Sequence, residues 1–375
     1  MRRFILSATV MAGLLTTAGP SSADEAASSL RINQIQVIGT HNSYHAGLTP
    51  GVAKLLKAVN PQAFAGLEYR HAGLAMQLDH GVRQVELDIF ADAQGGRFAH
   101  PFGATLNAGG AAAFDPAGVM QKPGFKVMHI QDLDYVSSCQ PFVACLREIR
   151  TWSSAHPRHV PIFILVETKT EPALAAVPHM ATPEPFTAAA LDALDKEIRS
   201  VFEAKEIITP DQVRGRYATL PESIVHGGWP TLKAARGKVV FLLDQSNVTR
   251  TYVAGHPALE GRVLFTNAEA GQPDAAFIEQ NDGSAETIAA LVKQGYLVRT
   301  RADADTKEGR SGETAKRDAA LQSGAQIVST DYPVFEPSPW TGYKVSLPKD
   351  AVARCNPVDA PKTCVDPEGP AHSNP

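Results

Sequence analysis

The sequence has little charge and no strong charge imbalance. Only 20% of its 375 residues are Asp, Glu, Lys or Arg, and the formal net charge is −4. No long run of either sign occurs, so nothing indicates the basic surface typical of nucleic-acid-binding proteins. Beyond residue 20, no stretch approaches the roughly 18 consecutive apolar residues of a membrane-spanning helix. With 44% hydrophobic residues, the chain is not disordered and can bury a large core.

Residues 1–23 have the pattern of a secretory signal. Two arginines follow the initial methionine, Phe4 to Ala18 carries no charge, and Ser21 to Ala23 supplies the small residues of a cleavage site. The alternative is a buried N-terminal helix, and the arginine pair alone is weak evidence for twin-arginine export. We expect a mature chain from about Asp24 and a secreted protein, extracellular or periplasmic.

Cysteine is also scarce, with four in the chain. Four cysteines allow three pairings, and an exported protein would oxidise them. We favour the local pairs Cys139–Cys145 and Cys355–Cys364. A metal site is the alternative, although neither spacing resembles the CxxC pairs of zinc modules. Residues 346–375 are rich in proline and are expected to form an irregular tail stapled by the second pair.

Between these ends, short apolar runs alternate with amphipathic segments. The apolar runs predict strands at 32–38, 82–89, 125–130, 161–167, 238–244, 262–265, 296–300 and 325–330. Leu191, Leu194 and Ile198 fall on one helical stripe between two of them. Alternating strands and helices imply an α/β fold with a parallel sheet, and eight units fit a (β/α)8 TIM-like barrel over residues 24–345. No GxGxxG follows the first strand, which removes the obvious open-sheet alternative.

Two carboxylates share one face of the second predicted strand. Successive strand residues alternate between faces, so Glu86 and Asp88 point the same way at the strand's carboxyl end. Barrel active sites lie at that end. Two like charges this close repel each other unless a positive group lies between them, and a hard divalent cation meets that need. The alternative is an ion pair with an arginine such as Arg83 or Arg70.

Other polar residues also follow predicted strands. Glu167 ends an apolar run where packing gives no reason for a glutamate, although a salt bridge with Lys169 is an alternative. His41 can exchange a proton near neutral pH, and the adjacent Asn42 offers an oxygen suited to calcium or magnesium. His100 follows the acidic pair at a distance that lets a turn bring it over the barrel mouth.

The ordered series of these residues resembles a known family. His41-Asn42, Glu86-x-Asp88, His100 and Glu167 look like the catalytic series of calcium-dependent phosphatidylinositol-specific phospholipase C, including its secreted bacterial members. Further similar stretches are 38–44, 81–88, 298–305 and 329–332. The resemblance spans residues 36–333, which covers the whole predicted barrel.

The resemblance implies a cofactor and roles for particular residues. Calcium is the implied cofactor, with ligands Asn42, Glu86, Asp88 and Glu167. The implied active-site histidines are His41 and His100. Less direct matches, Lys169 and Arg301, are placed near the substrate phosphate or the inositol hydroxyls. His129, Asp132 and Asp134 also resemble a segment of the secreted enzymes, and their role stays open between support of the barrel mouth and substrate contact.

The implied reaction is calcium-dependent cleavage of phosphatidylinositol to diacylglycerol and an inositol (cyclic) phosphate by intramolecular attack of an inositol hydroxyl. We assign His100 to the leaving group and His41 to the phosphate and attacking hydroxyl, with Glu86 or Glu167 as the alternative base. The expected enzyme is a monomer that meets its lipid transiently at a membrane surface, with no nucleic-acid partner.

Two other functions are compatible with parts of this pattern. A glycerophosphodiester phosphodiesterase has a similar barrel, metal pair and histidines, but normally starts with His-Arg-Gly where this chain has His41-Asn42-Ser43. A non-catalytic protein that binds calcium or inositol head groups would need only the acidic residues. Such a protein would need neither His41 nor His100, so the presence of both argues against this alternative.

Overall fold

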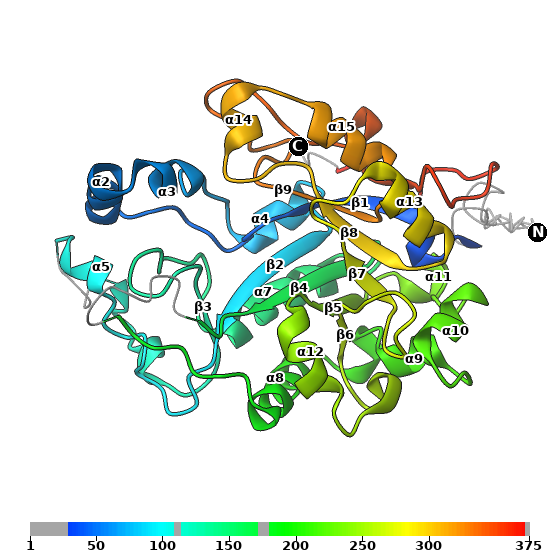
Figure 1. Cartoon of the computed structure of the whole chain (residues 1–375), viewed down its shortest axis with the longest axis horizontal. Helices are drawn as coiled ribbons and strands as arrows, with labels where there is room; N and C mark the ends of the chain where they lie inside the picture. The colour runs from blue at the N-terminus through cyan, green and yellow to red at the C-terminus, as the bar shows by residue number, and fades with distance from the viewer. Residues whose placement is uncertain (1–28, 109–113, 172–179, 372–375) are drawn as a thin grey trace, which may run out of the picture.

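The computed structural model describes residues 29–108, 114–171 and 180–371, so the expected signal segment lies outside the described chain. Eight parallel strands follow the spatial order β6-β5-β4-β2-β1-β9-β8-β7. Their bounds are β1 Ile35–Thr40, β2 Gln84–Phe90, β4 Ile162–Thr168, β5 Val239–Leu243, β6 Leu264–Thr266, β7 Phe277–Glu279, β8 Leu297–Arg301 and β9 Ile327–Thr330. A bridge between Asn267 and Phe277 joins the two ends of this order, so the sheet forms the predicted TIM-like barrel, nearly closed (Figure 1).

Seven of the eight predicted strands overlap with barrel strands, and one prediction is wrong. The run 125–130 contains β3 (Lys126–Val127), which pairs antiparallel with the end of β2 and is not part of the barrel. The barrel strand absent from the prediction is β7, which has three residues. A strand this short shows no periodicity that a sequence could reveal.

Helices occupy most of the connections between the strands (Figure 1). They are α2 Pro50–Val59, α3 Pro61–Gly66, α4 Leu74–Asp79, α5 Phe102–Thr105, α7 Phe142–Ala155, α8 Ala188–Val201, α9 Pro210–Arg214, α10 Leu220–Val225, α11 Leu232–Ala235, α12 Ser246–Val253, α13 Ala285–Lys293, α14 Lys307–Ser311 and α15 Ala315–Gln322. The stripe Leu191, Leu194 and Ile198 is the buried face of α8, as predicted. The Thr187 side chain caps this helix by accepting from the backbone N–H of Ala190.

The alternation predicted for β2 holds in the structure. Its apolar side chains join the large core under the helices, whereas Glu86 and Asp88 lie on the opposite face and are also buried. Gly39 of β1 permits this arrangement, because a Cβ there would lie 1.9 Å from Oε1 of Gln84. A side chain at position 39 would therefore displace the neighbouring strand's polar face.

The C-terminal segment is less irregular than predicted. β10 (Ala351–Cys355) pairs antiparallel with the start of β1, and β11 (Glu368–Pro370) pairs with β10. The Glu368 carboxylate accepts a hydrogen bond from Nη2 of Arg83, which immediately precedes β2, at 2.8 Å. The tail therefore extends the sheet at the amino end of the barrel, opposite the end where active sites form.

Both disulfides that we favoured are present, Cys139–Cys145 and Cys355–Cys364. Replacing Cys355 and Cys364 together with serine should lower the free energy of unfolding by about 2–4 kcal/mol, because the cross-link restricts the unfolded chain and holds β10 near β11. Urea denaturation of the oxidised proteins measures this difference. A double variant as stable as the parent would show that the hydrogen bonds of β10 and β11 alone hold the tail.

A second, smaller apolar cluster lies at the carboxyl end of β2. It contains Val52 and Leu56 of α2, Phe90 at the end of β2, and Tyr135. Figure 1 shows α2, α3 and α5 together at one end of the molecule. No helix in the described ranges has the length and hydrophobicity needed to cross a bilayer.

Candidate active site

Carboxylates from three neighbouring strands meet at the carboxyl end of the barrel. Asp88 of β2 is the sheet neighbour of Glu167 of β4, and Asp244 directly follows β5, the next strand. One carboxylate oxygen from each of Glu86, Glu167 and Asp244 lies within 4.8 Å of the other two. We call Glu86, Asp88, Glu167 and Asp244 the acidic cluster. Asp244 was not among the predicted ligands, although it follows a buried apolar strand just as Glu167 does.

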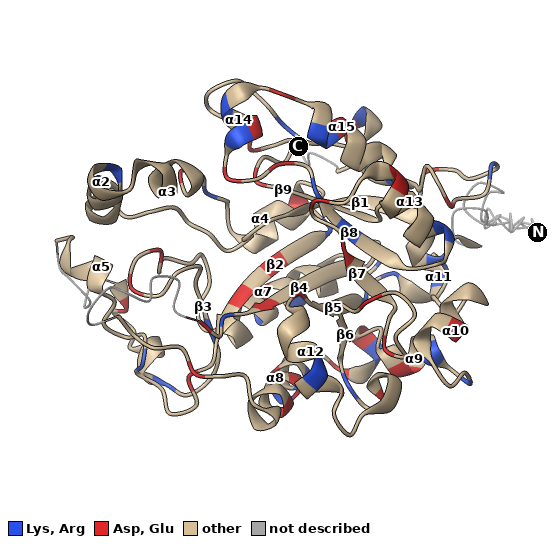
Figure 2. Ribbon diagram, in the orientation of Figure 1, with Lys and Arg blue, Asp and Glu red and all other residues tan. Residues whose placement is uncertain are grey.

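Two cations partly neutralise the acidic cluster, and Figure 2 shows the acidic bands on β2. Lys169 Nζ lies 2.8 Å from Asp88 Oδ2 and 2.6 Å from Glu167 Oε1. Arg299 of β8 donates from Nη2 to Glu86 Oε2 at 2.6 Å. The alternative interpretation of Glu167, a salt bridge with Lys169, is thus also realised. Four carboxylates face two cations, which leaves negative charge in excess.

Burial and mutual repulsion shift the pKa values of the acidic cluster. Burial, with Asp244 nearby, raises the pKa of Glu86 to about 7 despite the charge of Arg299. Burial and the neighbouring Glu167 hold the pKa of Asp88 well above its ordinary value. Burial would also raise the pKa of Glu167, but Lys169 lowers it overall. A further positive charge among these groups would relieve their repulsion.

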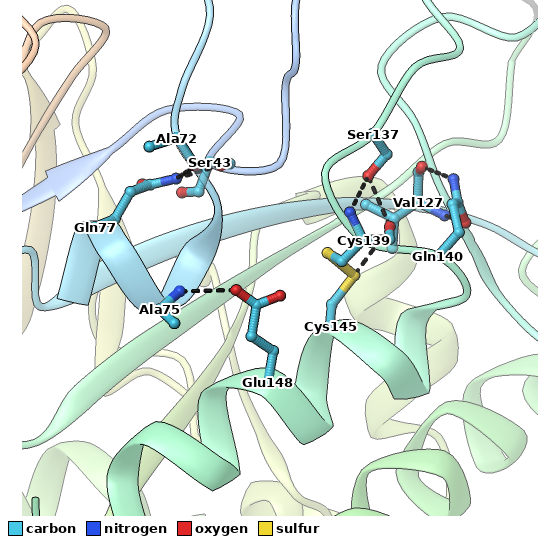
Figure 3. The surroundings of a disulfide bond; sticks show 10 residues. All are labelled: Ser43, Ala72, Ala75, Gln77, Val127, Ser137, Cys139, Gln140, Cys145 and Glu148. Atoms are coloured by element: carbon cyan, nitrogen blue, oxygen red, sulfur yellow. Dashed lines mark hydrogen bonds between the residues drawn. A yellow bond between two sulfur atoms is a disulfide. The ribbon is translucent and has the colours of Figure 1, made fainter. Parts of the chain in front are cut away.

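The turn after β1 is fixed from two sides. Asn42 adopts a left-handed backbone with φ of 47°, a conformation that asparagine tolerates better than most residues. Ser43 Oγ accepts from the backbone N–H of Glu86 at 2.7 Å. Gln77 of α4 donates to the Ser43 carbonyl at 2.6 Å (Figure 3). These bonds hold the turn, and with it His41, against β2.

Asn42 also faces the acidic cluster. With its amide nitrogen toward Asp88, it donates to both carboxylate oxygens at 3.2 Å and accepts from the hydroxyl of Tyr69 at 2.8 Å. With its amide rotated by half a turn, the side-chain oxygen would face Asp88 and could share a cation with it. An amide oxygen together with carboxylates is the type of ligand set that Ca²⁺ prefers.

His41 lies between the acidic cluster and a second group of charges. Its Nδ1 is 2.8 Å from Asp331 Oδ1, and its Nε2 is 3.7 Å from Glu86 Oε1. Arg301 Nη1 lies 3.3 Å from the same Nε2. Removal from water lowers the pKa of His41 well below its ordinary value, and Arg301 lowers it further, although Asp331 opposes both. A neutral His41 that donates its Nδ1 proton to Asp331 has its lone pair on Nε2, the atom that Arg301 contacts.

A second histidine beside the acidic cluster is His129. Its Nδ1 lies 2.9 Å from Asp134 Oδ2, and the buried His45 contacts the other oxygen of Asp134, also at 2.9 Å. Burial alone would raise the pKa of Asp134, but His45 and His129 lower it below its ordinary value. The charge of His129 also lowers the pKa of Glu167. With 20% of its side chain exposed, His129 is accessible to a substrate.

The segment that carries His129 is held against α7. Val127 donates its backbone N–H to Gln140 Oε1 at 2.9 Å, and Gln140 Nε2 donates back to the Val127 carbonyl. The Cys139–Cys145 disulfide joins the end of this segment to the first turn of α7 (Figure 3). The orientation of His129 therefore depends on covalent and hydrogen-bonded support from outside the barrel.

The structure places His100 differently from the other predicted residues. It is exposed, and the hydrogen bond found for its ring is with Gln121 Nε2 at 3.4 Å. Within the described residues, no contact links it to the acidic cluster. The other predicted residues, Asn42, Glu86, Asp88, Glu167, His41, Lys169 and Arg301, do lie in one contact network. Asp132 supports the mouth, because its carboxylate accepts from the backbone N–H groups of Phe102 and Ala181.

Comparison with protein families agrees with this geometry. Residues 30–357 match the family described as phosphoinositide phospholipase C, Ca²⁺-dependent. The chain belongs to this family. It is therefore a calcium-dependent phosphoinositide phospholipase C, a phosphodiesterase. The family match decides against the glycerophosphodiesterase and against the non-catalytic binding protein. Comparison with curated proteins gives no match.

Solved structures of calcium-dependent phospholipases C have the same fold as this phospholipase C. A Pseudomonas enzyme with myo-inositol is 14% identical, with a TM-score of 0.53 over 86% of this chain and 99% of that one. A second crystal form of the Pseudomonas enzyme is 15% identical, with a TM-score of 0.52 over 83% and 95%.

The cofactor of the phospholipase C family agrees with the residues found here. Calcium requires oxygen ligands and enough negative charge to offset its own, and the acidic cluster supplies both. The two disulfides are typical of proteins that fold outside the cytosol.

Proposed function

We propose that this phospholipase C cleaves phosphatidylinositol to diacylglycerol and an inositol (cyclic) phosphate through attack of an inositol hydroxyl on the neighbouring phosphorus. The observation that carries the proposal is the placement of His41 between Asp331 and Glu86, next to a buried acidic cluster. A histidine that can accept a proton thus lies beside groups that can hold a cation. Intramolecular attack needs both and no external nucleophile.

His41 is the proposed base. Asp331 accepts a hydrogen bond from Nδ1 and so favours the tautomer whose lone pair is on Nε2, the atom that Arg301 Nη1 now contacts at 3.3 Å. The attacking hydroxyl gives its proton to Nε2 as its oxygen bonds to phosphorus. Asp331 is itself held in place, because its backbone N–H donates to Asp303 Oδ1 at 2.8 Å. Glu86, 3.7 Å from Nε2, is the alternative base.

His129 is the proposed acid. The family resemblance in the sequence indicated His100 for this role. Asp134 Oδ2 lies 2.9 Å from Nδ1 of His129 and fixes the orientation of the ring. The other ring nitrogen can then give its proton to the glycerol oxygen as the phosphorus–oxygen bond breaks. One proton is taken up and one is given, so each turnover that forms a cyclic product leaves the two histidines with exchanged protonation states.

Asn42, Glu86, Asp88, Glu167 and Asp244 are the proposed calcium ligands. When bound, the ion would lower the pKa of the attacking hydroxyl and offset charge that develops on the phosphate oxygens. Lys169 now neutralises two of these carboxylates, and we propose that it turns toward the substrate phosphate or inositol hydroxyls. Arg301, which contacts both His41 and Asp331, is proposed to bind the phosphate.

The substrate is proposed to be reached at a membrane surface by a monomeric enzyme that is exported through residues 1–23. Release of water-soluble inositol phosphates from phosphatidylinositol vesicles tests the reaction, with calcium and with excess chelator. Calcium-dependent release together with diacylglycerol would support substrate, reaction and cofactor. Release from glycerophosphoinositol only would contradict the lipid substrate.

A pair of histidine variants separates the two candidate acids. We expect His129→Ala to lower turnover by about 10²-fold, because the leaving group loses its proton donor. The matched variant His100→Ala removes an exposed ring that contacts Gln121 and should stay within about twofold of the parent. Steady-state kinetics on the same vesicles measures both. The opposite ranking would restore His100 to the site and leave His129 a supporting role.

A further inference from the structure

A buried histidine that the proposed reaction does not use contacts the turn that carries His41. This residue is His71, in the segment before α4, and its side chain is 0% exposed. Its Nε2 lies 3.0 Å from the backbone carbonyl oxygen of His41, and its Nδ1 lies 2.7 Å from Glu336 Oε2. The ring therefore meets the proposed base through the backbone of that base and not through its imidazole.

Both ring nitrogens of His71 face hydrogen-bond acceptors. Neither a carbonyl oxygen nor an ionised carboxylate can donate, so each contact requires a hydrogen on the ring nitrogen. A neutral imidazole carries only one such hydrogen. With Glu336 ionised, His71 is therefore an imidazolium that donates on both sides. The alternative is a proton on Glu336, which would make Nδ1 an acceptor.

The contacts of Glu336 favour the charged ring. Its Oε1 accepts from the backbone N–H of Ala72 at 2.6 Å, while Oε2 faces the ring of His71. A nitrogen-to-oxygen distance of 2.7 Å is typical of a hydrogen bond between an imidazolium and a carboxylate. One carboxylate thus holds both the ring of His71 and the backbone of the next residue.

The contacts of His71 join three segments that are distant in the chain. His41 follows β1, His71 precedes α4, and Glu336 follows β9. The backbone N–H of His71 also donates to the carbonyl of His45 at 2.8 Å. Gln77 of α4 donates to one carbonyl after β1 and to one beside His71 (Figure 3). The turn after β1 is therefore supported along its backbone.

The direction of the His41 ring depends on this backbone. The ring lies between two buried carboxylates, with Nδ1 2.8 Å from Asp331 Oδ1 and Nε2 3.7 Å from Glu86 Oε1. A shift of the turn would misalign Nε2 with the hydroxyl that it is proposed to deprotonate. Misplacement of a reacting group by about 1 Å is enough to lower a rate by about 10²-fold.

We propose that His71 is a positioning residue for His41, and that it is an imidazolium that donates to Glu336 and to the His41 carbonyl at the same time. It touches no reacting group and transfers no proton. Its role rests on the proposed function, in which His41 is the base. Its charge and its effect on the His41 ring do not depend on that function and can be measured separately.

Two neutral substitutions separate the two contacts of the ring. In His71→Gln the amide nitrogen reaches the position of Nε2 and still donates to the His41 carbonyl, whereas in His71→Asn it takes the position of Nδ1 and donates to Glu336. We expect kcat on phosphatidylinositol vesicles to fall at least about tenfold in His71→Asn and less than about threefold in His71→Gln, with KM nearly unchanged in both.

A second buried histidine provides the matched control. The ring of His159 also has both nitrogens in hydrogen bonds, with Ser153 Oγ and the Val160 carbonyl, away from the acidic cluster. His159→Asn should lower the stability and keep the parental kcat. Thermal unfolding and circular dichroism show whether each variant is folded.

Nitrogen-15 NMR of the histidine rings tests the charge without substrate. At neutral pH we expect an N–H signal from both ring nitrogens of His71 in the parent, assigned by their loss in His71→Gln. Glu336→Gln should remove the Nδ1 signal and keep the Nε2 signal. The ring signals of His41, assigned with His41→Ala, should shift in His71→Asn and stay near their parental positions in His71→Gln.

The possible outcomes are distinct. A single N–H signal from His71 in the parent would place the proton on Glu336 and overturn the proposal. Equal losses of kcat in His71→Asn and His71→Gln, or a larger loss in His71→Gln, would overturn the positioning role, as would an equal loss in His159→Asn. If the parent releases no inositol phosphate, the proposed function fails, and the His41 signals of the two His71 variants decide the positioning role alone.

Discussion

His41→Ala is expected to lower kcat by about 10²- to 10⁴-fold, the range found for loss of a positioned acid or base. Asp331 holds the Nδ1 side of the ring, and alanine removes the ring together with Nε2, the proposed proton acceptor. KM should change much less, because the ring contributes mainly in the transition state. Initial rates over a range of phosphatidylinositol concentrations would separate the two constants.

A remote histidine provides the control for this variant. His226 follows α10, donates from Nδ1 to the Glu222 carbonyl and stacks on Tyr217, away from the acidic cluster, so His226→Ala should keep the parental rate. Circular dichroism and thermal unfolding confirm that both variants are folded. Near-normal turnover of His41→Ala would exclude His41 as the base and transfer that role to Glu86, which lies 3.7 Å from it.

Removal of calcium is expected to lower the activity by at least about 10²-fold, because a bound cation contributes several kcal/mol to stabilising the charge on the phosphoryl group. Substitutions in the acidic cluster should raise the calcium concentration that gives half-maximal activity. We expect increases of at least about tenfold for Glu86→Gln, Asp88→Asn and Asp244→Asn, because each variant removes one negative ligand. Activity titrations with buffered calcium measure the shift.

The matched control is Asp195→Asn on α8. Asp195 is also a buried carboxylate and is bonded to Tyr252 and Arg262, away from the acidic cluster. Its substitution lowers stability but should leave the calcium requirement unchanged. A parental calcium requirement in all three cluster variants would mean that these carboxylates serve only to pair with Lys169 and Arg299. Calcium binding measured by calorimetry, without substrate, gives a second readout.

Much of the barrel could be predicted because its long strands carry a clear pattern. β2 alternates between apolar and polar residues, and β4 is a continuous apolar run that ends at Glu167. β7 could not be predicted, because Phe277–Glu279 is too short to show a period and is recognised only through its pairing with β8. The run at 125–130 was misleading because its apolar residues pack beside β2 without entering the barrel.

Site residues at the ends of predicted strands could be predicted from the sequence. Site residues in loops could not, because their position depends on how the loop folds back over the barrel. Glu86, Asp88 and Glu167 follow directly from their strands, and Asp244 could have been found by the same rule. Choosing between His100 and His129 depends on the path of the loop after β2, which the sequence does not encode locally. The feature that favours the proposal of His129 is Asp134, five residues after it, which contacts two histidines. Arg299 was missed as well, because its buried pairing with Glu86 joins β8 to β2.

The pairing of β1 with β9 and β10 has a consequence for how the chain is made. The first strand of the barrel bonds to segments that are synthesised last, since Ile35 pairs with Cys355 and Val37 with Ile327. The ring of strands therefore cannot close until nearly the whole chain has left the ribosome. A chain that crosses the membrane while it is being synthesised would therefore cross with the ring open. Closure, oxidation of Cys355 with Cys364 and assembly of the site would all follow arrival in the compartment where the enzyme works.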